Sequence, residues 1–404
     1  MNSLSGQNSH TKSQSHATSQ KLPVAVVGGS AAGFFTASLL AQRGVPVQVF
    51  ERAETLEPIS RTLIVTHKLR ALLGRAAAGS VVNEIRRFEL FTDGRAAKIQ
   101  LNEPDLIIER STLIRGLAEE ARRAGAEITL GRRFHGLHSN GASLLLDVER
   151  SADGAREEVR TQTVVGSDGA ASRVAQSAGW PRQETVPLVQ AIVELPKDMP
   201  PETVRVWFVP DDTPYFYWLI PDSANRGVLG LIGESGQETR KHLERFLEKR
   251  HLEPISFQGA RIPVYNRWVP VKRRVGAGDV YLVGDAAAQV KVTTVGGIVT
   301  GFRGALGVAE SIVNRGESTE LRRLRRELDM HLLLRRSLHH FQQSDYSRLV
   351  DLLNDSARRS LSDYSRDEAL KVIWHICLSQ PRLLLMGLRG LLTGGRTFAP
   401  PPRT

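Results

Sequence analysis

The glycine-rich turn at Gly28–Gly33 is the feature that most restricts what this chain can fold into. It follows a β-branched run, Val24–Gly28, which predicts a buried strand. It precedes an apolar stretch at helical spacing that ends at Gly44, and a second strand is predicted at Pro46–Phe50. Because the crossover between such strands is right-handed, residues 24–51 are expected to form one β-α-β unit with two parallel strands.

Each small residue of this turn has its own predicted role. Gly28 permits a tight turn, Ser30 is compact enough for backbone N–H groups to approach a pyrophosphate, and Gly33 lets the helix pack closely on the strand. The helix start adds partial positive charge for the phosphates. Glu51, at the end of the second strand, is placed to accept hydrogen bonds from ribose hydroxyls. The pattern predicts a dinucleotide site, with an ordinary β-α-β turn as the alternative.

A second motif spans residues 278–302. Its strand delivers Asp285 to the carboxyl end of the sheet, where a carboxylate can accept hydrogen bonds from a polyol chain. Gly296 and Gly297 then open a helix whose backbone N–H groups can face an anionic edge. A reduced flavin carries negative charge on one edge of its ring system, so a helix start there favours the reduced state. The motif predicts FAD, and a plain strand followed by a capped helix is the alternative.

Two shorter segments add to this prediction. Arg110 directly precedes a predicted helix at about 111–124, where a cation can reach the flavin or its diphosphate; a solvated arginine is the alternative. Gly166–Gly169 follows a strand and resembles a second turn next to the nucleotide, although a simple Asp-Gly turn explains it as well.

From Gln190 to Ile232 the pattern changes to short runs separated by Pro, Asp and Gly, which predicts an antiparallel sheet without crossover helices. The expected fold class is therefore α/β with an α+β insertion, a Rossmann-like FAD-binding domain carrying an inserted antiparallel sheet and C-terminal helices. The predicted boundaries are a disordered tail at 1–20, a discontinuous FAD-binding domain at 21–183 and 274–320, the substrate-binding sheet at 184–273, a helical region at 321–395 and an extended tail at 396–404.

The aromatic residues of the inserted sheet predict a hydrophobic substrate pocket. Strand alternation sends Phe216 and Trp218 to one face, and Tyr215 and Tyr217 to the other. Phe216 and Trp218 are the predicted pocket residues. A sheet face that packs an ordinary core is the alternative.

Composition excludes several classes of protein. With 41% hydrophobic and 24% charged residues, the chain is of globular type. Cys377 is the single cysteine, which excludes an internal disulfide framework and cysteine-based metal sites, and it fits a reducing, cytoplasmic setting. The histidines have no metal-ligand spacing, so no metal is predicted. No apolar run is long enough to span a membrane, and residues 1–20 lack the apolar segment of a secretory signal.

The net charge of +11 raises the question of anionic partners. It is not accompanied by a nucleic-acid-binding signature, so no nucleic acid is expected. Beyond Leu321 the chain combines leucines with arginines, which is compatible with peripheral docking to an anionic membrane at the inner face. Helices with one buried face and one solvated basic face are the alternative.

Three of these segments, the Gly28–Gly33 turn with Glu51, the Gly166–Gly169 turn and the segment at Gly284–Asp285, together resemble the group A flavoprotein monooxygenase-type fold. The segment GDAAAQVKVTTVGGI and the strand FYWLIP are similar to those of the geranylgeranyl reductase family, over about residues 22–395. This resemblance implies FAD contacts at Ala32, Glu51, Arg110, Asp285, Gly297 and Ile298, and also at Arg52 and Phe134. It implies hydride transfer from reduced flavin to an isoprenoid double bond, with NADPH or NADH as the expected reductant.

The sequence departs from that family in the stretch that follows Pro58. The family often has a cysteine there, whereas this chain has Arg61. We therefore expect reduction or hydroxylation of a lipophilic isoprenoid, polyketide or aromatic molecule, and no catalytic acid or base is predicted. A flavin-dependent halogenase, with Lys68 as its lysine, and a non-redox cyclase or isomerase are the alternatives.

Overall fold

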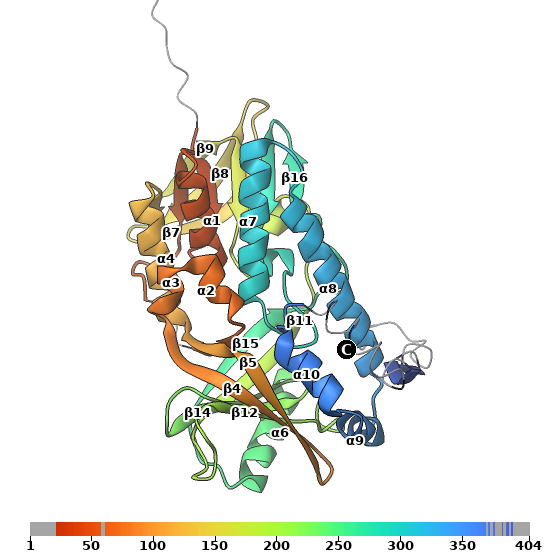
Figure 1. Ribbon diagram of the computed structural model, residues 1–404. Helices are drawn as coiled ribbons and strands as arrows, with labels where there is room; N and C mark the ends of the chain where they lie inside the picture. The colour runs from red at the N-terminus through yellow and green to blue at the C-terminus, as the bar shows by residue number, and fades with distance from the viewer. Residues whose placement is uncertain are drawn as a thin grey trace, which may run out of the picture.

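The computed structural model describes residues 22–57 and 61–368, together with residues 371, 375, 382, 385–387, 389 and 390. The predicted tails at 1–20 and 396–404 lie outside the described residues, as does Cys377. Figure 1 shows two halves, one above the other, with the long helix α8 (Thr319–Leu338) running along the side of both.

The upper half is built on a six-stranded sheet. In spatial order its strands are β16 (Lys272–Val275), β17 (Gly278–Leu282), β10 (Thr163–Gly166), β1 (Val24–Val27), β2 (Val47–Phe50) and β6 (Glu127–Thr129). The strands from β17 to β6 are parallel, and β16 pairs with β17 antiparallel. Since β1 and β2 pair in parallel around α1 (Ala31–Ala41), the predicted β-α-β unit is confirmed.

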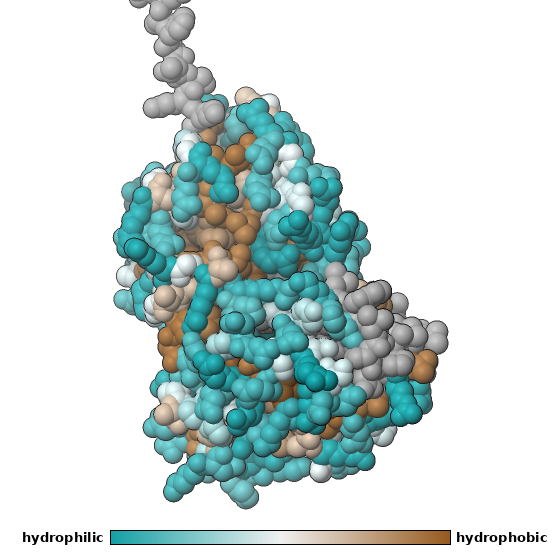
Figure 2. Space-filling model, viewed as in Figure 1, coloured by the Kyte–Doolittle hydropathy of each residue, from teal (hydrophilic) through white to brown (hydrophobic). Residues whose placement is uncertain are grey.

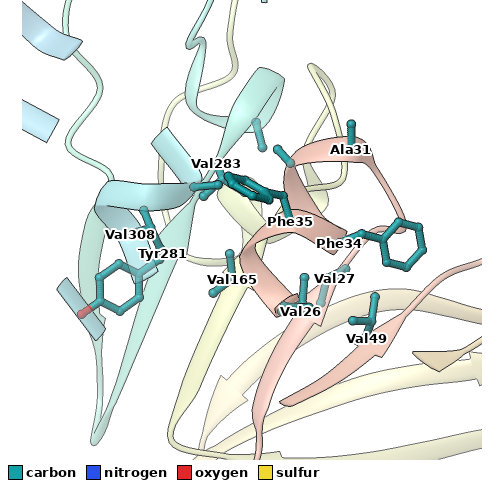
Figure 3. Packing of buried hydrophobic residues seen from close by; sticks show 14 of the residues in the cluster. Val26, Val27, Ala31, Phe34, Phe35, Val49, Val165, Tyr281, Val283 and Val308 are labelled. Carbon is teal, nitrogen blue, oxygen red and sulfur yellow. The ribbon is translucent and has the colours of Figure 1, made fainter. Parts of the chain in front are cut away.

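Three helices pack together on this sheet: α1, α4 (Arg110–Arg123) and α7 (Ile298–Asn314). Helix α1 is apolar around its whole circumference and buried along nearly all its length, as expected for a helix with protein on every side. Its Phe35 meets Phe302 of α7 edge to face, with ring centroids 5.1 Å apart. Figure 3 shows the core beneath, where Val26, Val49 and Val165 of the parallel strands pack together with these helices.

The lower half is an eight-stranded sheet. In spatial order its strands are β15 (Pro254–Pro263), β11 (Thr185–Glu194), β14 (Arg226–Ile232), β13 (Tyr217–Pro221), β12 (Thr203–Trp207), β4 (Val81–Thr92), β5 (Arg95–Glu109) and β3 (Thr62–Val65). Neighbouring strands are antiparallel except β12 and β4, which are parallel. Helix α6 (Gly236–Lys249) packs against β11 and β14.

The structure differs from one predicted boundary, because residues 62–65 and 81–109, which fall in the predicted FAD-binding domain at 21–183, form strands of the lower sheet. Strands β4 and β5 form a long hairpin that turns at Asp93 and Gly94, and β4 then pairs with β12, more than a hundred residues away. No local sequence pattern indicates a pairing between strands so far apart in the chain. Because this segment follows the β-α-β unit in the sequence, its position alone favours the FAD-binding domain.

Short elements complete the upper half. A three-stranded antiparallel sheet consists of β7 (Arg132–Ser139), β8 (Leu144–Arg150) and β9 (Arg156–Thr161). The remaining helices there are α2 (Lys68–Leu73), α3 (Arg75–Ala78), α5 (Arg173–Ser177) and the 3-10 turn η1 (Gly284–Ala287).

The predicted C-terminal helices are present as α8, α9 (Gln343–Asp351) and α10 (Asp355–Asp363). Helix α9 packs on β4 and β5, and α10 packs on β5. None of the helices in the described ranges is long and apolar enough to cross a membrane. On the face shown in Figure 2, hydrophobic residues gather in the upper half around α1, and the lower half is mostly hydrophilic.

Candidate functional site

The turn after β1 is shaped by close backbone contacts. Gly28 has a φ of +103°, and a Cβ atom there would lie 2.7 Å from the carbonyl oxygen of Ser167. A Cβ atom at Gly33 would lie 2.4 Å from the carbonyl oxygen of Gly28 and 2.4 Å from Oγ of Ser167. Ser30 caps α1, and its hydroxyl accepts a hydrogen bond from the N–H of Gly33 at 3.1 Å. The turn thus combines tight backbone packing with a partly exposed helix start, as a pyrophosphate site requires.

Glu51 lies at the end of β2 and faces this turn. Its Oε2 accepts a hydrogen bond from the N–H of Gly29 at 2.5 Å, and its Oε1 accepts one from the N–H of Ala53 at 2.9 Å. A carboxylate has about four acceptor positions, so two remain for hydroxyl groups of a ligand. The position is compatible with the predicted ribose contact.

Asp285 lies in η1, directly after β17, between two arginines. Burial raises the pKa of its carboxyl above the ordinary value, and the positive charges of Arg61 and Arg110 oppose that shift. Burial likewise lowers the pKa of both arginines, and the charge of Arg110 lowers the pKa of Arg61 further. The backbone joins the two arginines, since the N–H of Arg110 donates to the carbonyl oxygen of Arg61 at 3.0 Å. The result is a half-buried polar centre with a carboxylate and two guanidinium groups.

The loop before α7 brings Gly297 and Ile298 to this centre. A Cβ atom at Gly297 would lie 3.3 Å from Oδ1 of Asp285, so a larger residue would crowd the carboxylate. Gly296 has a different role from the one predicted, because it does not line the cavity described below. A Cβ atom there would lie 3.3 Å from Cε of Lys291, whose side chain passes Gly296.

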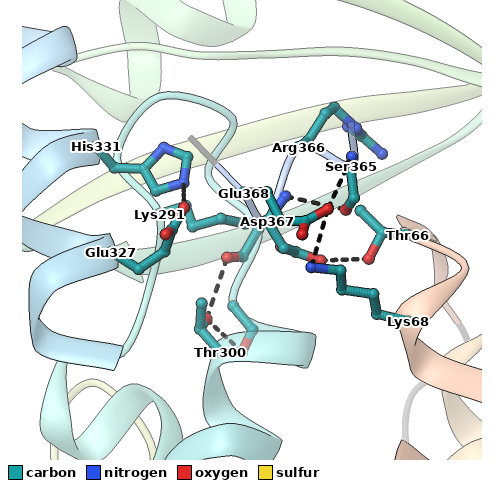
Figure 4. Close-up of polar contacts among 12 residues, drawn as sticks. Thr66, Lys68, Lys291, Thr300, Glu327, His331, Ser365, Arg366, Asp367 and Glu368 are labelled. Carbon is teal, nitrogen blue, oxygen red and sulfur yellow. Dashed lines mark hydrogen bonds and ion pairs between the residues drawn. The ribbon is translucent and has the colours of Figure 1, made fainter. Parts of the chain in front are cut away.

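That lysine ties the loop to the C-terminal segment, as Figure 4 shows. Its ammonium group forms an ion pair with Asp367, which also accepts a hydrogen bond from the hydroxyl of Thr66 at the end of β3. The Lys291 and Asp367 side chains are 6% and 2% exposed. A buried pair of this kind fixes the two segments strongly, because either charge alone would be costly to bury.

One cavity of about 800 Å³ joins these features. The predicted cofactor residues of the first β-α-β unit that line it are Gly28, Ser30, Ala32, Glu51 and Arg52. The other predicted cofactor residues that line it are Arg110, Phe134, Asp285, Gly297 and Ile298. Gly33 and Gly296 do not: Gly33 acts in packing beneath the turn, and Gly296 makes room for Lys291.

Sequence reasoning missed Arg132 and Arg133, which line this cavity beside Phe134. Arg173 also lines it, near the turn after β10. The position of the first two directly before a predicted contact residue was an available signal. In the turn after β10, Asp168 accepts hydrogen bonds from Oγ of Ser172 and the N–H of Arg173, so it caps α5 while it lines the cavity.

Comparison with known proteins identifies the family. The family model for an FAD-binding domain matches residues 21–316. Digeranylgeranylglycerophospholipid reductase 1 of Methanopyrus kandleri is 30% identical over 294 residues, which cover 69% of this chain and 76% of that protein. The chain belongs to the geranylgeranyl reductase family of FAD-dependent oxidoreductases. The corresponding reductase 1 of Methanothermobacter thermautotrophicus is 28% identical over 239 residues, and the match covers 56% of this chain and 59% of that relative's length.

Solved structures agree on the fold. A geranylgeranyl bacteriochlorophyll reductase-like protein from Thermoplasma acidophilum superposes with a TM-score of 0.76 at 18% identity, covering 92% of this chain and 99% of the other. A flavin-dependent brominase has a TM-score of 0.67 at 15% identity, covering 91% of this chain and 98% of the other. At these identities the likeness concerns the fold, which is shared by enzymes of different chemistry.

The residues of the cavity fit the FAD that this family binds. The glycine turn leaves room for a diphosphate at a helix start, the Glu51 carboxylate faces the same turn, and Asp285 lines the same cavity together with two arginines. Backbone N–H groups, carboxylates and guanidinium groups are the donors and acceptors that a dinucleotide with a polyol chain requires.

Beyond Asp285 the cavity reaches the lower sheet of this flavoprotein. Leu63 of β3, Leu188 of β11 and Ile262 of β15 line it, together with Val295 of the loop before α7. Gln190 is the polar residue of this wall, and its amide donates to Oε1 of Gln258 at 2.7 Å. This part of the cavity is therefore mainly apolar.

Phe216 and Trp218, the predicted pocket residues, do not line this cavity. They meet edge to face at 6.1 Å within an apolar cluster that also contains Leu188 and Val295. The prediction that Tyr215 faces the opposite side from them is wrong, because Tyr215 belongs to the same cluster while Tyr217 packs on the α6 side. Strand β13 begins only at Tyr217, so strict alternation does not apply to the residues before it.

Lys68 is not part of the cavity lining. Its ammonium group lies 3.3 Å from Oε2 of Glu368. Within the described ranges no group of three or more His, Cys, Asp or Glu side chains could hold a metal ion.

Proposed function

We propose that this flavoprotein reduces a carbon–carbon double bond of a lipophilic, isoprenoid-type acceptor, with NADPH or NADH as electron donor. The observation that carries the proposal is the continuity of the cavity from the predicted FAD residues to the apolar wall of Leu63, Leu188 and Ile262. Burial of an apolar chain against such a wall gains roughly 25 cal/mol per Å². The names of the sequence relatives, which are reductases of digeranylgeranylglycerophospholipid, support an acceptor of this class.

Residues in different parts of the cavity have different proposed roles. When bound, FAD would supply the hydride for one carbon of the double bond, and the other carbon would take a proton, so that two hydrogens are added in all. Asp285 would accept hydrogen bonds from the polyol chain, and Arg61 and Arg110 place positive charge beside it. The start of α7 contributes further partial positive charge, so negative charge at this edge of the site is stabilised. The apolar wall holds the acceptor and excludes water.

Hydroxylation of the same acceptor is a second candidate. Arg61 lines the cavity and stands in the stretch where the resembling family often has a cysteine. This departure lies within the site and favours a reaction other than double-bond reduction. Halogenation is disfavoured, because Lys68 is paired with Glu368 and does not line the cavity.

The experiment is a pair of single-turnover measurements on the holoenzyme. Under anaerobic conditions, NADPH or NADH should bleach the flavin absorbance, and a lipophilic polyene should restore it with a product that is heavier by two hydrogens. The same reduced enzyme mixed with acceptor and oxygen should give no oxygenated product. An oxygenated product would support hydroxylation instead. Dithionite-reduced enzyme that no polyene reoxidises would contradict double-bond reduction, and the absence of an oxygenated product when that reduced enzyme meets acceptor and oxygen would contradict hydroxylation. Failure of both nicotinamides alone would remove only the proposed donor.

Lys68→Met serves as the matched control. Because Lys68 lies outside the cavity lining, the variant should reduce the acceptor as the parent does. Addition of chloride or bromide with oxygen should yield no halogenated product in either protein. Halogenated product from the parent that disappears in Lys68→Met would favour the halogenase reading.

A further inference from the structure

Val295, in the loop before α7, has a backbone conformation that its side chain disfavours. Its φ is +52°, in the left-handed region. Among the described residues other than glycine, His251, Ala288 and Arg315 share this region, and Ala288 and Arg315 end helical turns, where it is common. Val295 is the one of the four with a branched β-carbon, for which a left-handed φ is most unfavourable. The loop therefore keeps a valine where a glycine would fit without strain.

The anchors of this loop explain how the strained conformation is maintained. The N–H of Lys291 donates to the carbonyl oxygen of Gly296 at 3.2 Å and closes the loop at its base. The Lys291 ammonium is paired with the buried Asp367 (Figure 4). Oγ1 of Thr293 lies 2.6 Å from Nδ1 of His331, a residue of α8 that is 3% exposed. The loop is thus held at its base and along its side, as the persistence of a strained residue requires.

The side chain of Val295 reaches the part of the cavity proposed to hold the acceptor. Val295 and Leu188 of β11 both line the cavity, and both pack against the apolar cluster of the lower sheet that contains Trp218. Two positions further along the chain, Gly297 lies beside Asp285. The valine is therefore placed where the predicted FAD residues give way to the apolar wall.

Packing of the fold gives a weaker reason for this valine than the cavity does. Val295 is only partly buried, whereas Val292 of the same loop is 4% exposed and has no left-handed φ. Glycine at position 295 would relieve the strain, but it would remove two methyl groups from the cavity wall. A single methylene group in an apolar pocket changes the preference between ligands by about tenfold to two hundredfold. Strain at a cavity wall is consistent with a side chain that the site requires.

We propose that Val295 determines which acceptors enter the site. Its methyl groups narrow the apolar part of the cavity, so that an acyclic polyene chain fits and a chain that carries a ring is disfavoured. This assignment rests on the proposed function, since it concerns the same acceptor. Val295 acts through shape alone and takes no part in the transfer of hydride or proton.

The stability of matched variants tests the strain. Val295→Gly and Val295→Ala both remove the γ-methyl groups, but the glycine also relieves the left-handed φ, so Val295→Gly should have the higher melting temperature. At Val292 the order should be reversed, because glycine there costs chain entropy and relieves nothing. The same order of glycine and alanine at both positions would overturn the proposal, since no strain would then have to be offset by the site.

The preference between two ligands tests the role in specificity. The probes are geranylgeraniol and retinol, isoprenoid alcohols of equal carbon number, of which only retinol carries a ring. Dissociation constants are measured by titration of the oxidised holoenzyme, followed by the visible flavin spectrum. The parent should bind geranylgeraniol more tightly. Val295→Ala and Val295→Gly should shift the ratio of the two constants toward retinol by about tenfold, with FAD retained. Val292→Ala should leave the ratio unchanged, because Val292 does not line the cavity.

Equal binding of the two alcohols by the parent, or an unchanged ratio in both Val295 variants, would overturn the proposal. An equal shift in Val292→Ala would do the same, because a loosened loop would then explain it. Should Val295→Ala fail to fold, Val295→Gly measures the same ratio. Binding of the alcohols without reduction of either would contradict the proposed function and leave the assignment of Val295 standing.

If neither alcohol binds, the proposed function fails, and two rigid probes of different width, 1-naphthol and 9-phenanthrol, decide the assignment. A gain for the wider probe in Val295→Ala that is absent in Val292→Ala supports it. The absence of binding or of such a gain overturns it.

Discussion

The two ends of the cavity are built from different parts of the chain. At the nucleotide end the shape comes from backbone: Gly28 and Gly33 leave no space for a Cβ atom, and Glu51 is fixed by two N–H groups. At the acceptor end the shape comes from side chains such as Leu63, Leu188 and Ile262, whose three strands lie far apart in the sequence. A backbone-built site tolerates almost no change, whereas a side-chain wall can be altered at small cost to the fold. One fold can therefore keep its cofactor while its acceptor changes.

The largest expected effect comes from the buried ion pair of Lys291 and Asp367, which ties the loop before α7 to the C-terminal segment. Asp367→Asn leaves the Lys291 ammonium buried without its counter-ion, which should lower the free energy of unfolding by about 3–5 kcal/mol. Chemical denaturation measures this loss. Glu368→Gln is the control, because its partners Lys68 and Lys371 are more exposed, and it should cost less than about 1 kcal/mol. Equal losses in the two variants would show that the buried pair does not hold the loop.

The ion pair of Lys291 and Asp367 also makes the free energy of unfolding depend on pH. Burial opposes ionisation of Asp367, but the charge of Lys291 and hydrogen bonds from Lys291 and Thr66 lower its pKa well below the ordinary value. Its stabilising contribution is therefore complete above about pH 4 and is lost as the pH falls toward the folded-state pKa. The difference in stability between the parent and Asp367→Asn should shrink below about pH 4. A difference that is constant across this range would contradict the assigned shift.

Two helical glycines test the nucleotide end. Gly33→Ala forces a Cβ atom to within 2.4 Å of a backbone oxygen, which should cost about 3 kcal/mol and remove FAD. Gly116→Ala in α4 places its Cβ atom 3.7 Å from the nearest neighbour and should stabilise the protein by about 0.5–1 kcal/mol. Denaturation curves and the flavin content of the purified proteins measure both effects. Full flavin content in Gly33→Ala would contradict the inference that close backbone packing shapes the nucleotide end.

Asp285→Ala tests the side-chain part of the FAD site. It removes the carboxylate between Arg61 and Arg110, so FAD loses an acceptor and the two arginines repel each other without compensation. The dissociation constant for FAD should rise by about tenfold to a hundredfold, which titration of the apoprotein measures. Glu54→Gln is the control, since Glu54 is exposed and does not line the cavity. An unchanged FAD affinity in Asp285→Ala would count against the assignment of Asp285.

The smallest effect is expected at the acceptor end. Leu188→Ala enlarges the apolar wall without touching the glycine turn, so the protein should keep its FAD. The Michaelis constant for the acceptor should rise by about tenfold or less, as expected for the loss of a few buried methylene groups. Steady-state kinetics with a single polyene measures the change. Loss of FAD in this variant would show that the two ends are not separable.

The difference between a nucleotide end built from backbone and an acceptor end built from side chains also explains which site residues could be predicted from the sequence. Gly28, Gly33 and Glu51 were predictable because local spacing fixes a strand, a turn and a helix. Asp285 was predictable because it follows a strand of the same parallel sheet. The hairpin of β4 and β5 was not, because its assignment depends on pairing with the distant strand β12.

The cases of Gly296 and Tyr215 show the limit at the level of single residues. The sequence pattern places Gly296 in a cofactor-binding loop. In the structure, the absence of a side chain at Gly296 leaves space for Lys291, which forms an ion pair with Asp367, 76 positions away. Tyr215 was placed by strand alternation, but the strand begins two residues later. Both outcomes depend on tertiary packing that no local pattern encodes.

The FAD content of purified Asp285→Ala and Leu188→Ala, measured side by side with the parent, shows whether FAD binding depends on the nucleotide end and not on the acceptor end. We expect stoichiometric FAD in the parent and in Leu188→Ala, and a clear loss in Asp285→Ala. Retention of FAD by Asp285→Ala together with its loss from Leu188→Ala would contradict the assignment of the two ends.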